Sequence, residues 1–147
     1  MIRSLFAALT APDPNPLDPT DAELALAALL VRLARTDETY SEVEKTRIDR
    51  VLAARQGLAP AQASALRHEA EIVESDAPDT VRFTRALKEK IPYDDRIKVI
   101  EALWEVALAD GQRDADEDAL IRMAAKLLGV NDVDSALARQ RVAKREM

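Results

Sequence analysis

The chain of 147 residues contains no cysteine, only three glycines and only 3% aromatic residues. The lack of cysteine excludes a disulfide scaffold, and a single histidine leaves too few soft ligands for a structural zinc or copper site. So few glycines exclude a collagen-like or glycine-rich array. The scarcity of aromatic and β-branched residues disfavours an all-β sandwich, whereas 48% hydrophobic residues exclude a disordered chain.

An excess of positive charge is also missing, since the net charge is −6. Duplex binding needs clustered Lys and Arg, so we expect no nucleic acid partner. The sequence contains no apolar run of the roughly 18 residues that a membrane span needs, and we expect a soluble, cytoplasmic protein. It also lacks a glycine-rich phosphate loop and a credible Ser–His arrangement, so we expect no enzyme activity. The basic residues near the C-terminus are interpreted as a solvated helix end: Arg139, Arg141, Lys144 and Arg145.

Four of the seven prolines lie between residues 12 and 19. Proline supplies no backbone donor, so this stretch predicts an extended linker. The residues before it form a short amphipathic pattern that is interrupted by Pro12. We therefore divide the chain into a short N-terminal helix with a Pro-rich linker, residues 1–19, and a helical domain, residues 20–147.

Capping residues and helix breakers divide the domain into helices. Two capping boxes, Thr20 to Glu23 and Ser41 to Glu44, mark helix starts, and all three glycines follow expected helix ends. No long segment alternates with period two. We therefore predict an all-α, single-domain bundle of about seven or eight helices. The expected helices run from Thr20 to about Arg35, from Ser41 to near Gly57, from Pro60 to before Asp76-Ala77-Pro78, from about Val81 until Pro92 stops it, from Pro92 or Tyr93 to Asp110-Gly111, from about Ala115 to Leu128, and from Asn131 or Asp132 onward.

The spacing of the apolar residues predicts which face of each helix is buried. Phe83 and Trp104 lie in apolar stripes and are expected in the core. His68 lies off the apolar stripe of its helix, which favours a surface position. The polar residues of that helix are expected to face water as a solvated acidic face with one arginine: Arg67, Glu69, Glu71 and Glu74.

The chain repeats itself with an offset of 73 residues, which relates about 24–58 to about 97–130. Each half consists of an apolar helix, an Asp, six further residues, a Glu and a second helix. We call residues 37–44 the first acidic connection and residues 110–117 the second acidic connection. The matched residues of the two halves are Leu26 and Val99, Leu30 and Leu103, Leu33 and Val106, Ala34 and Ala107, Asp37 and Asp110, Glu44 and Glu117, and Ile48 and Ile121.

The repeated carboxylates suggest a metal site. An EF-hand is rejected, because loop positions one and three would be the apolar Val106 and Leu108. A pseudo-twofold packing of the halves would instead gather four carboxylates. All-oxygen ligation favours Ca²⁺, Mg²⁺ or Mn²⁺. The predicted metal ligands are Asp37, Glu44, Asp110 and Glu117.

Helix capping is the competing interpretation of the same acids. Glu44 and Glu117 each occupy the third position of a helix, where a carboxylate satisfies backbone N–H groups and the helix dipole. Capping alone explains both glutamates, and Asp is an ordinary turn residue. The sequence therefore leaves open capping alone and capping combined with metal binding.

The second half resembles the TerB family of tellurite-resistance proteins and TerB-like domains. The resemblance rests on Val106 to Gly111 with Glu117, on Leu120 to Arg122 and on Leu127 to Val130, and it extends from about Ala22 to Arg141. Arg82 to Arg85 and Leu103 to Ala107 are similar to an uncharacterised bacterial branch. In the first half, Arg35-Thr36-Asp37-Glu38 keeps the acid and loses the glycine.

This resemblance implies two pseudo-symmetric helical halves and a divalent-metal site built from the repeated acids. The leading hypothesis is a TerB-like domain that binds a divalent cation, in tellurite resistance, stress or metal homeostasis. The alternative is a non-catalytic interaction module whose acids only cap helices. It would engage a protein partner or a membrane surface through its N-terminal helix. The oligomeric state cannot be read from the sequence.

Overall fold

The computed structural model describes residues 19–37, 39–77, 79–109 and 115–146. Within these ranges the chain forms α-helices and one short 3-10 helix, and no strand occurs in them. The all-α prediction is confirmed. The elements are α2 (Pro19–Ala34), η1 (Arg35–Asp37), α3 (Glu42–Gln56), α4 (Pro60–Asp76), α5 (Val81–Lys90), α6 (Tyr93–Leu108), α7 (Ala115–Leu127) and α8 (Asp132–Glu146).

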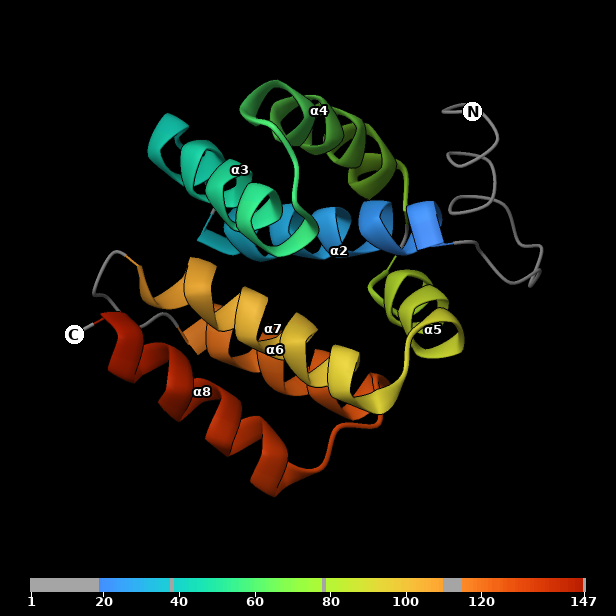
Figure 1. Cartoon of the computed structure of the whole chain (residues 1–147), viewed down its shortest axis with the longest axis vertical. Coiled ribbons are helices and arrows are strands. Elements are labelled where there is room, and N and C mark those ends of the chain that lie inside the picture. The colour runs from blue at the N-terminus through green and yellow to red at the C-terminus, as the bar shows by residue number, and fades with distance from the viewer. Residues whose placement is uncertain (1–18, 38, 78, 110–114, 147) are drawn as a thin grey trace.

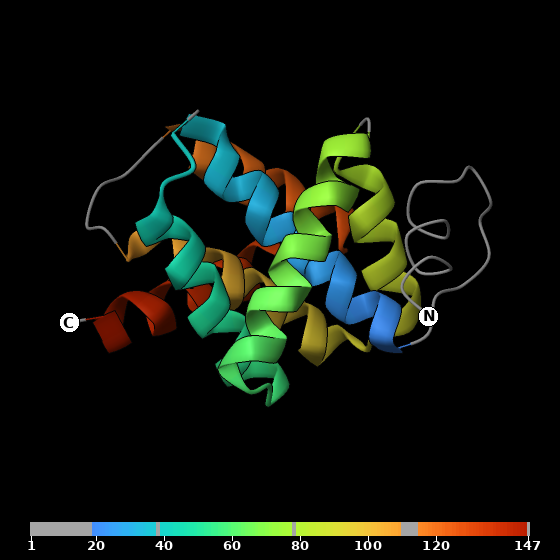
Figure 2. The ribbon, with the colours of Figure 1, turned by 90° about the horizontal axis from the view of Figure 1, so that it is seen from above.

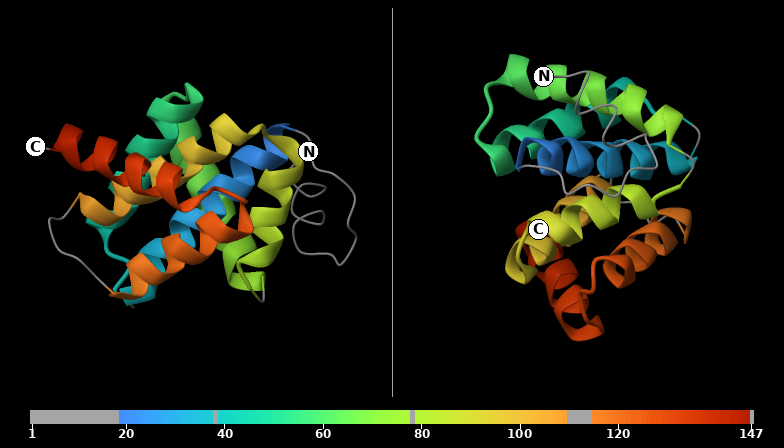
Figure 3. Two further views of the ribbon diagram at one scale, coloured as in Figure 1. Left: turned by 90° about the horizontal axis from the view of Figure 1, so that it is seen from below. Right: turned by 90° about the vertical axis from the view of Figure 1, so that its right-hand side faces the viewer.

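The helices form two groups on opposite sides of α2. Figure 1 shows α3 and α4 on one side of α2, and α6, α7 and α8 on the other. The right-hand view of Figure 3 shows the same two groups from the side. The short helix α5 packs against α2, α6 and α7.

Helix α2 forms the centre of the core because almost its whole circumference is apolar. Leu24, Leu29, Leu30 and Leu33 are at most 1% exposed, and the alanines between them are fully buried. A helix that is apolar all round can only be stable when it is covered on every side. Phe83 and Trp104 also lie in the core, at 0% and 7% exposure, as their apolar stripes predict.

Local chemistry fixes most helix ends where the sequence predicts them. Ser41 and Glu44 form the complete capping box of α3. Gly57 ends that helix in the left-handed conformation, with φ of 64°, and Gly129 takes φ of 74° after α7. At the start of α8, the side chain of Asn131 accepts a hydrogen bond from the N–H of Asp134 at 2.8 Å, as an N-cap does.

The expected start of the first long helix is wrong by two residues. The sequence predicts Thr20 as its N-cap, whereas Pro19 and Thr20 already belong to α2. Proline is favoured in the first turn of a helix because its φ is preset and its missing donor is not needed there. The expected N-terminal helix and most of the Pro-rich linker, residues 1–18, lie outside the described residues. None of the described helices has the length and apolar character required to cross a bilayer.

The repeat seen in the sequence is present in the helices. An offset of 73 residues carries α2 onto α6, α3 onto α7 and α4 onto α8, with differences of one or two residues at most helix ends. Matched apolar residues are buried in both halves; for example, Leu30 and Leu103 are both 0% exposed, as are Ile48 and Ile121. We therefore call α2, η1, α3 and α4 the first half, and α6, α7 and α8 the second half.

Candidate functional site

Of the four predicted metal ligands, only Glu44 and Glu117 have both backbone and side chain among the described residues. Glu44 and Glu117 lie in the first turns of α3 and α7, as predicted. The backbone of Asp37 belongs to η1, whereas its side chain lies outside the described part of the structure. Asp110 is one of residues 110–114, which also lie outside it.

Glu44 acts as a helix cap through one of its two carboxylate oxygens. The N–H and the hydroxyl of Ser41 donate to Glu44 Oε1 at 3.0 and 3.2 Å, and the hydroxyl of Thr39 donates to the same atom at 3.2 Å. In the described part of the chain, none of these bonds uses Oε2. Capping by Glu44 is therefore compatible with a further interaction at its second oxygen.

Glu117 is enclosed although it lies in the first turn of its helix. It is 8% exposed and makes polar interactions in that position. η1, which carries Asp37, packs against α7. Figure 2 shows α7 beginning beside the end of α2 and η1, so the first acidic connection of one half meets the helix of the other half that carries Glu117.

No three His, Cys, Asp or Glu residues within the described ranges lie close enough together to hold a metal ion. Glu44 and Glu117 therefore do not form such a group with other described acids. A cation site at these positions would require Asp37 or Asp110 in addition.

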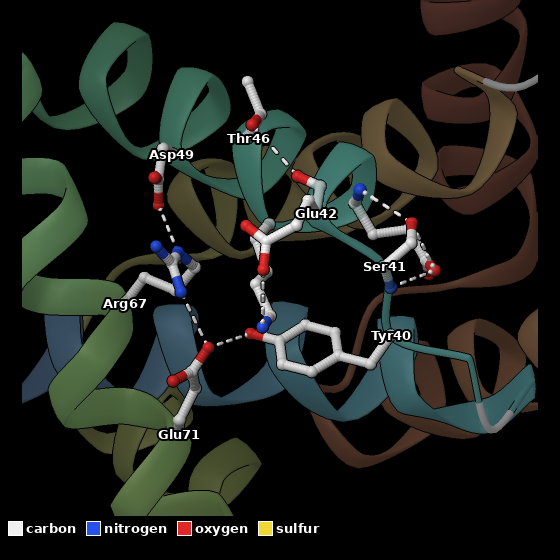
Figure 4. Close-up of polar contacts among 9 residues, drawn as sticks. Tyr40, Ser41, Glu42, Thr46, Asp49, Arg67 and Glu71 are labelled. Carbon is white, nitrogen blue, oxygen red and sulfur yellow. Dashed lines mark hydrogen bonds and ion pairs between the residues drawn. The ribbon is translucent and has the colours of Figure 1, made fainter.

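The first acidic connection is held by a network that the sequence did not predict, shown in Figure 4. The hydroxyl of Tyr40 donates a hydrogen bond to Glu71 of α4. Arg67 donates to Glu71 at 2.7 Å and to Asp49 of α3 at 2.6 Å. We call Tyr40, Asp49, Arg67 and Glu71 the Tyr40 network. It joins the first acidic connection to both α3 and α4.

Ionisation within the Tyr40 network follows from burial and pairing. Burial raises the pKa of Tyr40, and the hydrogen bond and charge of Glu71 raise it further, so its hydroxyl stays a donor. Burial alone would raise the pKa of Glu71, but the hydrogen bonds of Tyr40 and Arg67 outweigh it and lower that pKa. Glu71 is therefore an anion that accepts from two donors.

The interpretation of α4 as a helix with a fully solvated polar face is wrong for three residues. Arg67 is 7% exposed and Glu74 is 8% exposed, and Glu71 is partly buried within the Tyr40 network. Glu74 binds Arg32 of α2 at 3.0 Å and Arg35 of η1 at 3.0 Å. Arg67 and Glu71 are four residues apart on one helix, a spacing that could have revealed their pairing.

A family comparison identifies the fold to which these helices belong. The family model described as tellurite resistance protein TerB matches residues 23–140, which include nearly all of the described helices. The chain belongs to the TerB family. The comparisons with curated proteins and with solved structures each found no match.

In this TerB-family chain a second charged cluster joins the two halves. Arg55 of α3 donates to Glu105 of α6 at 2.6 Å and to Glu101 at 3.3 Å. Arg141 of α8 donates to Glu101 at 2.9 Å, and Arg145 lies 3.4 Å from the same carboxylate. Arg141 and Arg145 are exposed, as predicted for the end of α8, and they pair with Glu101 of α6, which is 9% exposed.

A cleft of about 640 Å³ lies between the halves of the TerB fold, beside this second cluster. Apolar side chains of α2, α5 and α6 line it, including Leu26, Leu87 and Val99, together with charged residues of both signs. Glu23, on its α2 wall, has its pKa raised by burial. His68 is exposed, and its ring Nδ1 lies 2.8 Å from the carbonyl oxygen of Ser64, which fits the predicted surface position.

Proposed function

We propose that this TerB-family chain is a cytoplasmic, non-catalytic helical domain that binds one divalent cation, Ca²⁺, Mg²⁺ or Mn²⁺, between its two halves. The ligands are Asp37 and Glu44 from the first acidic connection, and Asp110 and Glu117 from the second. Oxygen ligands of this kind suit hard cations. The physiological setting that we propose is stress or metal homeostasis, including the tellurite resistance after which the family is described.

One observation carries this proposal: η1 packs against α7. The segment that carries Asp37 in the first half therefore lies against the helix that carries Glu117 in the second half. The repeat alone could have left the two acidic connections at opposite ends of the molecule. A single shared site requires the two halves to meet beside these residues, and the contact of η1 with α7 supports it.

Two further features support the proposal. Glu117 is 8% exposed and lies in the first turn of α7, the helix against which η1 packs. Glu44 uses only Oε1 for its capping bonds among the described residues, so a cation can take Oε2 without breaking the cap. Capping and cation binding then act together at the same residue.

A second candidate function is an interaction module, which the cleft between the halves favours. Apolar residues and charged residues of both signs line this cleft together, and protein interfaces also combine such side chains. In that case the repeated acids only cap helices. The chain would engage a protein partner or a membrane surface, with its N-terminal segment taking part.

Thermal unfolding with and without cation distinguishes the two candidates. The wild-type chain is heated with Mn²⁺, Mg²⁺ or Ca²⁺, and with a chelator. Binding to the folded state alone stabilises it by about 2.7 kcal/mol at a hundredfold excess over Kd. We expect this shift in the wild type and its loss in the double variant Asp110→Asn/Glu117→Gln.

The matched control is Asp94→Asn/Asp132→Asn, which removes two exposed acids from the first turns of α6 and α8. It changes the same charge at two helix starts outside the proposed site. Its cation shift should equal that of the wild type. If neither the wild type nor the control responds to any cation, the acids only cap helices and the interaction module is the better account.

A further inference from the structure

The cleft between the halves lies beside the start of α2. Ala22 and Glu23 belong to the first two turns of this helix and line the cleft, and Leu26 continues the same wall. The chain enters α2 at Pro19, directly after residues 1–18, which lie outside the described part of the structure. The residues before α2 are therefore attached within a few positions of one wall of the cleft.

Two acceptors of the cleft have no donor among the described residues. Gln56 lines the cleft, and its side-chain oxygen Oε1 is buried without a hydrogen-bond partner in the part of the chain that the structure describes. Burial raises the pKa of Glu23, and no described charge or hydrogen bond offsets this effect. Since an unpaired acceptor away from water costs free energy, the two side chains favour an occupant that carries N–H donors or a positive charge.

The segment before α2 combines apolar character with such a charge. Its apolar residues recur at helical spacing: Ile2, Leu5, Phe6 and Leu9. Arg3 lies among them and is the one basic residue between residues 1 and 18. The cleft presents apolar side chains together with the carboxylate of Glu23. The segment and the cleft therefore match both in apolar character and in charge.

The Pro-rich linker is long enough for the segment to reach the cleft of its own chain. At about 3.1 Å per residue, an extended stretch from residue 10 to Pro19 spans up to about 28 Å. A cleft of about 640 Å³ lies within the size range of binding pockets and can take several side chains of the segment. Attachment to the same chain also raises the effective concentration of the segment to roughly the millimolar range.

We propose that residues 2–9 dock into the cleft of their own chain, with Leu5 and Phe6 among its apolar residues and Arg3 beside Glu23. The cleft is then an intramolecular docking surface, and a protein partner has to displace the segment before it can enter. This inference goes beyond the proposed cation site and is independent of it, because none of the four proposed cation ligands lines the cleft.

Disulfide trapping in the full chain tests this docking. The chain has no cysteine, so Ala8→Cys/Ala54→Cys introduces its only two thiols, one in the segment and one at an exposed position of the cleft. The variant is equilibrated in a glutathione redox buffer that contains a chelator, and mass spectrometry of the intact chain measures the intramolecular disulfide. Ala8→Cys/Ala65→Cys is the matched control, because Ala65 is an exposed alanine of α4, which contributes no described residue to the cleft.

We expect the effective concentration of the two thiols to be about tenfold higher in the cleft pair than in the control. Adding Phe6→Glu to the cleft pair should lower it to the control value, because a carboxylate would then face apolar residues. Adding Glu23→Gln should lower it about threefold through the loss of one charge pair.

Equal values in the cleft pair and the control, or no effect of Phe6→Glu, would overturn the docking. An unchanged value with Glu23→Gln would contradict the pairing of Glu23 with Arg3. A disulfide that forms only between two chains would assign the cleft to a second copy and would also overturn docking within one chain. Because the chelator removes divalent cations, each of these results is independent of whether the cation site exists.

Discussion

The two halves of this TerB-family chain have the same helices but attach their third helix differently. In the first half, α4 packs against both α2 and α3. In the second half, the corresponding α8 packs along α6. Matched apolar residues are buried in both halves, so the difference does not arise in the core.

The polar contacts of the two halves differ in the same way. In the first half, Arg67 of α4 reaches Asp49 of α3 and so joins the two helices. At the corresponding positions of the second half, 73 residues later, are Gln140 and Arg122, which cannot form this ion pair. The second half uses Glu101 of α6 instead, which binds Arg141 and Arg145 of α8.

This contrast shows that the two halves share their pattern of buried apolar residues but differ in the polar contacts that fix their third helix. The burial of matched apolar residues maintains the fold in both halves. The polar residues that differ decide which helices are fixed to each other. The first half fixes its third helix to its acidic connection through Tyr40 and Glu71. In the sequence, the first connection lacks the glycine that the second one has.

The largest effect expected from this comparison follows loss of Arg67. Arg67→Leu leaves Asp49 and Glu71 without their shared cation in a partly buried position. Removing one partner of a buried ion pair is strongly destabilising, and we expect the free energy of unfolding to fall by about 3 kcal/mol. Urea unfolding of the wild type and the variant measures this difference.

The counterpart in the second half provides the control. Gln140 is exposed on α8, so Gln140→Leu should change the free energy of unfolding by no more than about 0.5 kcal/mol. Equal losses in the two variants would show that the halves are fixed in the same way, against the comparison drawn here.

A smaller, pH-dependent effect is expected for Glu101. Burial alone would raise its pKa, but hydrogen bonds and charges of Arg141 and Arg55 outweigh burial and lower it. Its contribution to stability is therefore complete above the ordinary Glu pKa of 4.5 and is lost as the pH falls through the lower folded-state value. We expect Glu101→Gln to cost about 1 to 2 kcal/mol at pH 7, because charge-assisted hydrogen bonds are lost.

The stability difference between the wild type and Glu101→Gln should shrink as the pH falls below 4.5 through the lowered folded-state pKa of Glu101, because protonation removes its charge. Urea unfolding at several pH values between 7 and 3 measures it. A difference that stays constant over this range would mean that Glu101 acts through packing and not through its charge.

The helix ends could be predicted from the sequence because their causes are local. Ser41 with Glu44, Gly57 and Asn131 each act within a few residues of the end that they fix. The repeat could also be predicted, because matched apolar residues must be buried in both halves. The placement of Glu44 and Glu117 in first turns followed from the same local rules.

The buried charges could not be predicted because their partners are distant in the sequence. Arg67 is 18 residues from Asp49, and Glu74 is 42 residues from Arg32. From the sequence alone, a polar residue on a helix is assigned to the solvent-facing side, because the position of the neighbouring helix is not known. One local signal for Tyr40 was missed: it lies two residues after Glu38, and the matching position of the second half is Gly111.

The central claim is that the two halves share one cation, and the stoichiometry of Mn²⁺ binding tests it most directly. Calorimetric titration should give one ion per wild-type chain. Asp37→Asn in the first half and Glu117→Gln in the second should each abolish that binding, although the two residues come from different halves. Two ions per chain, or full binding by Asp37→Asn, would contradict a shared site.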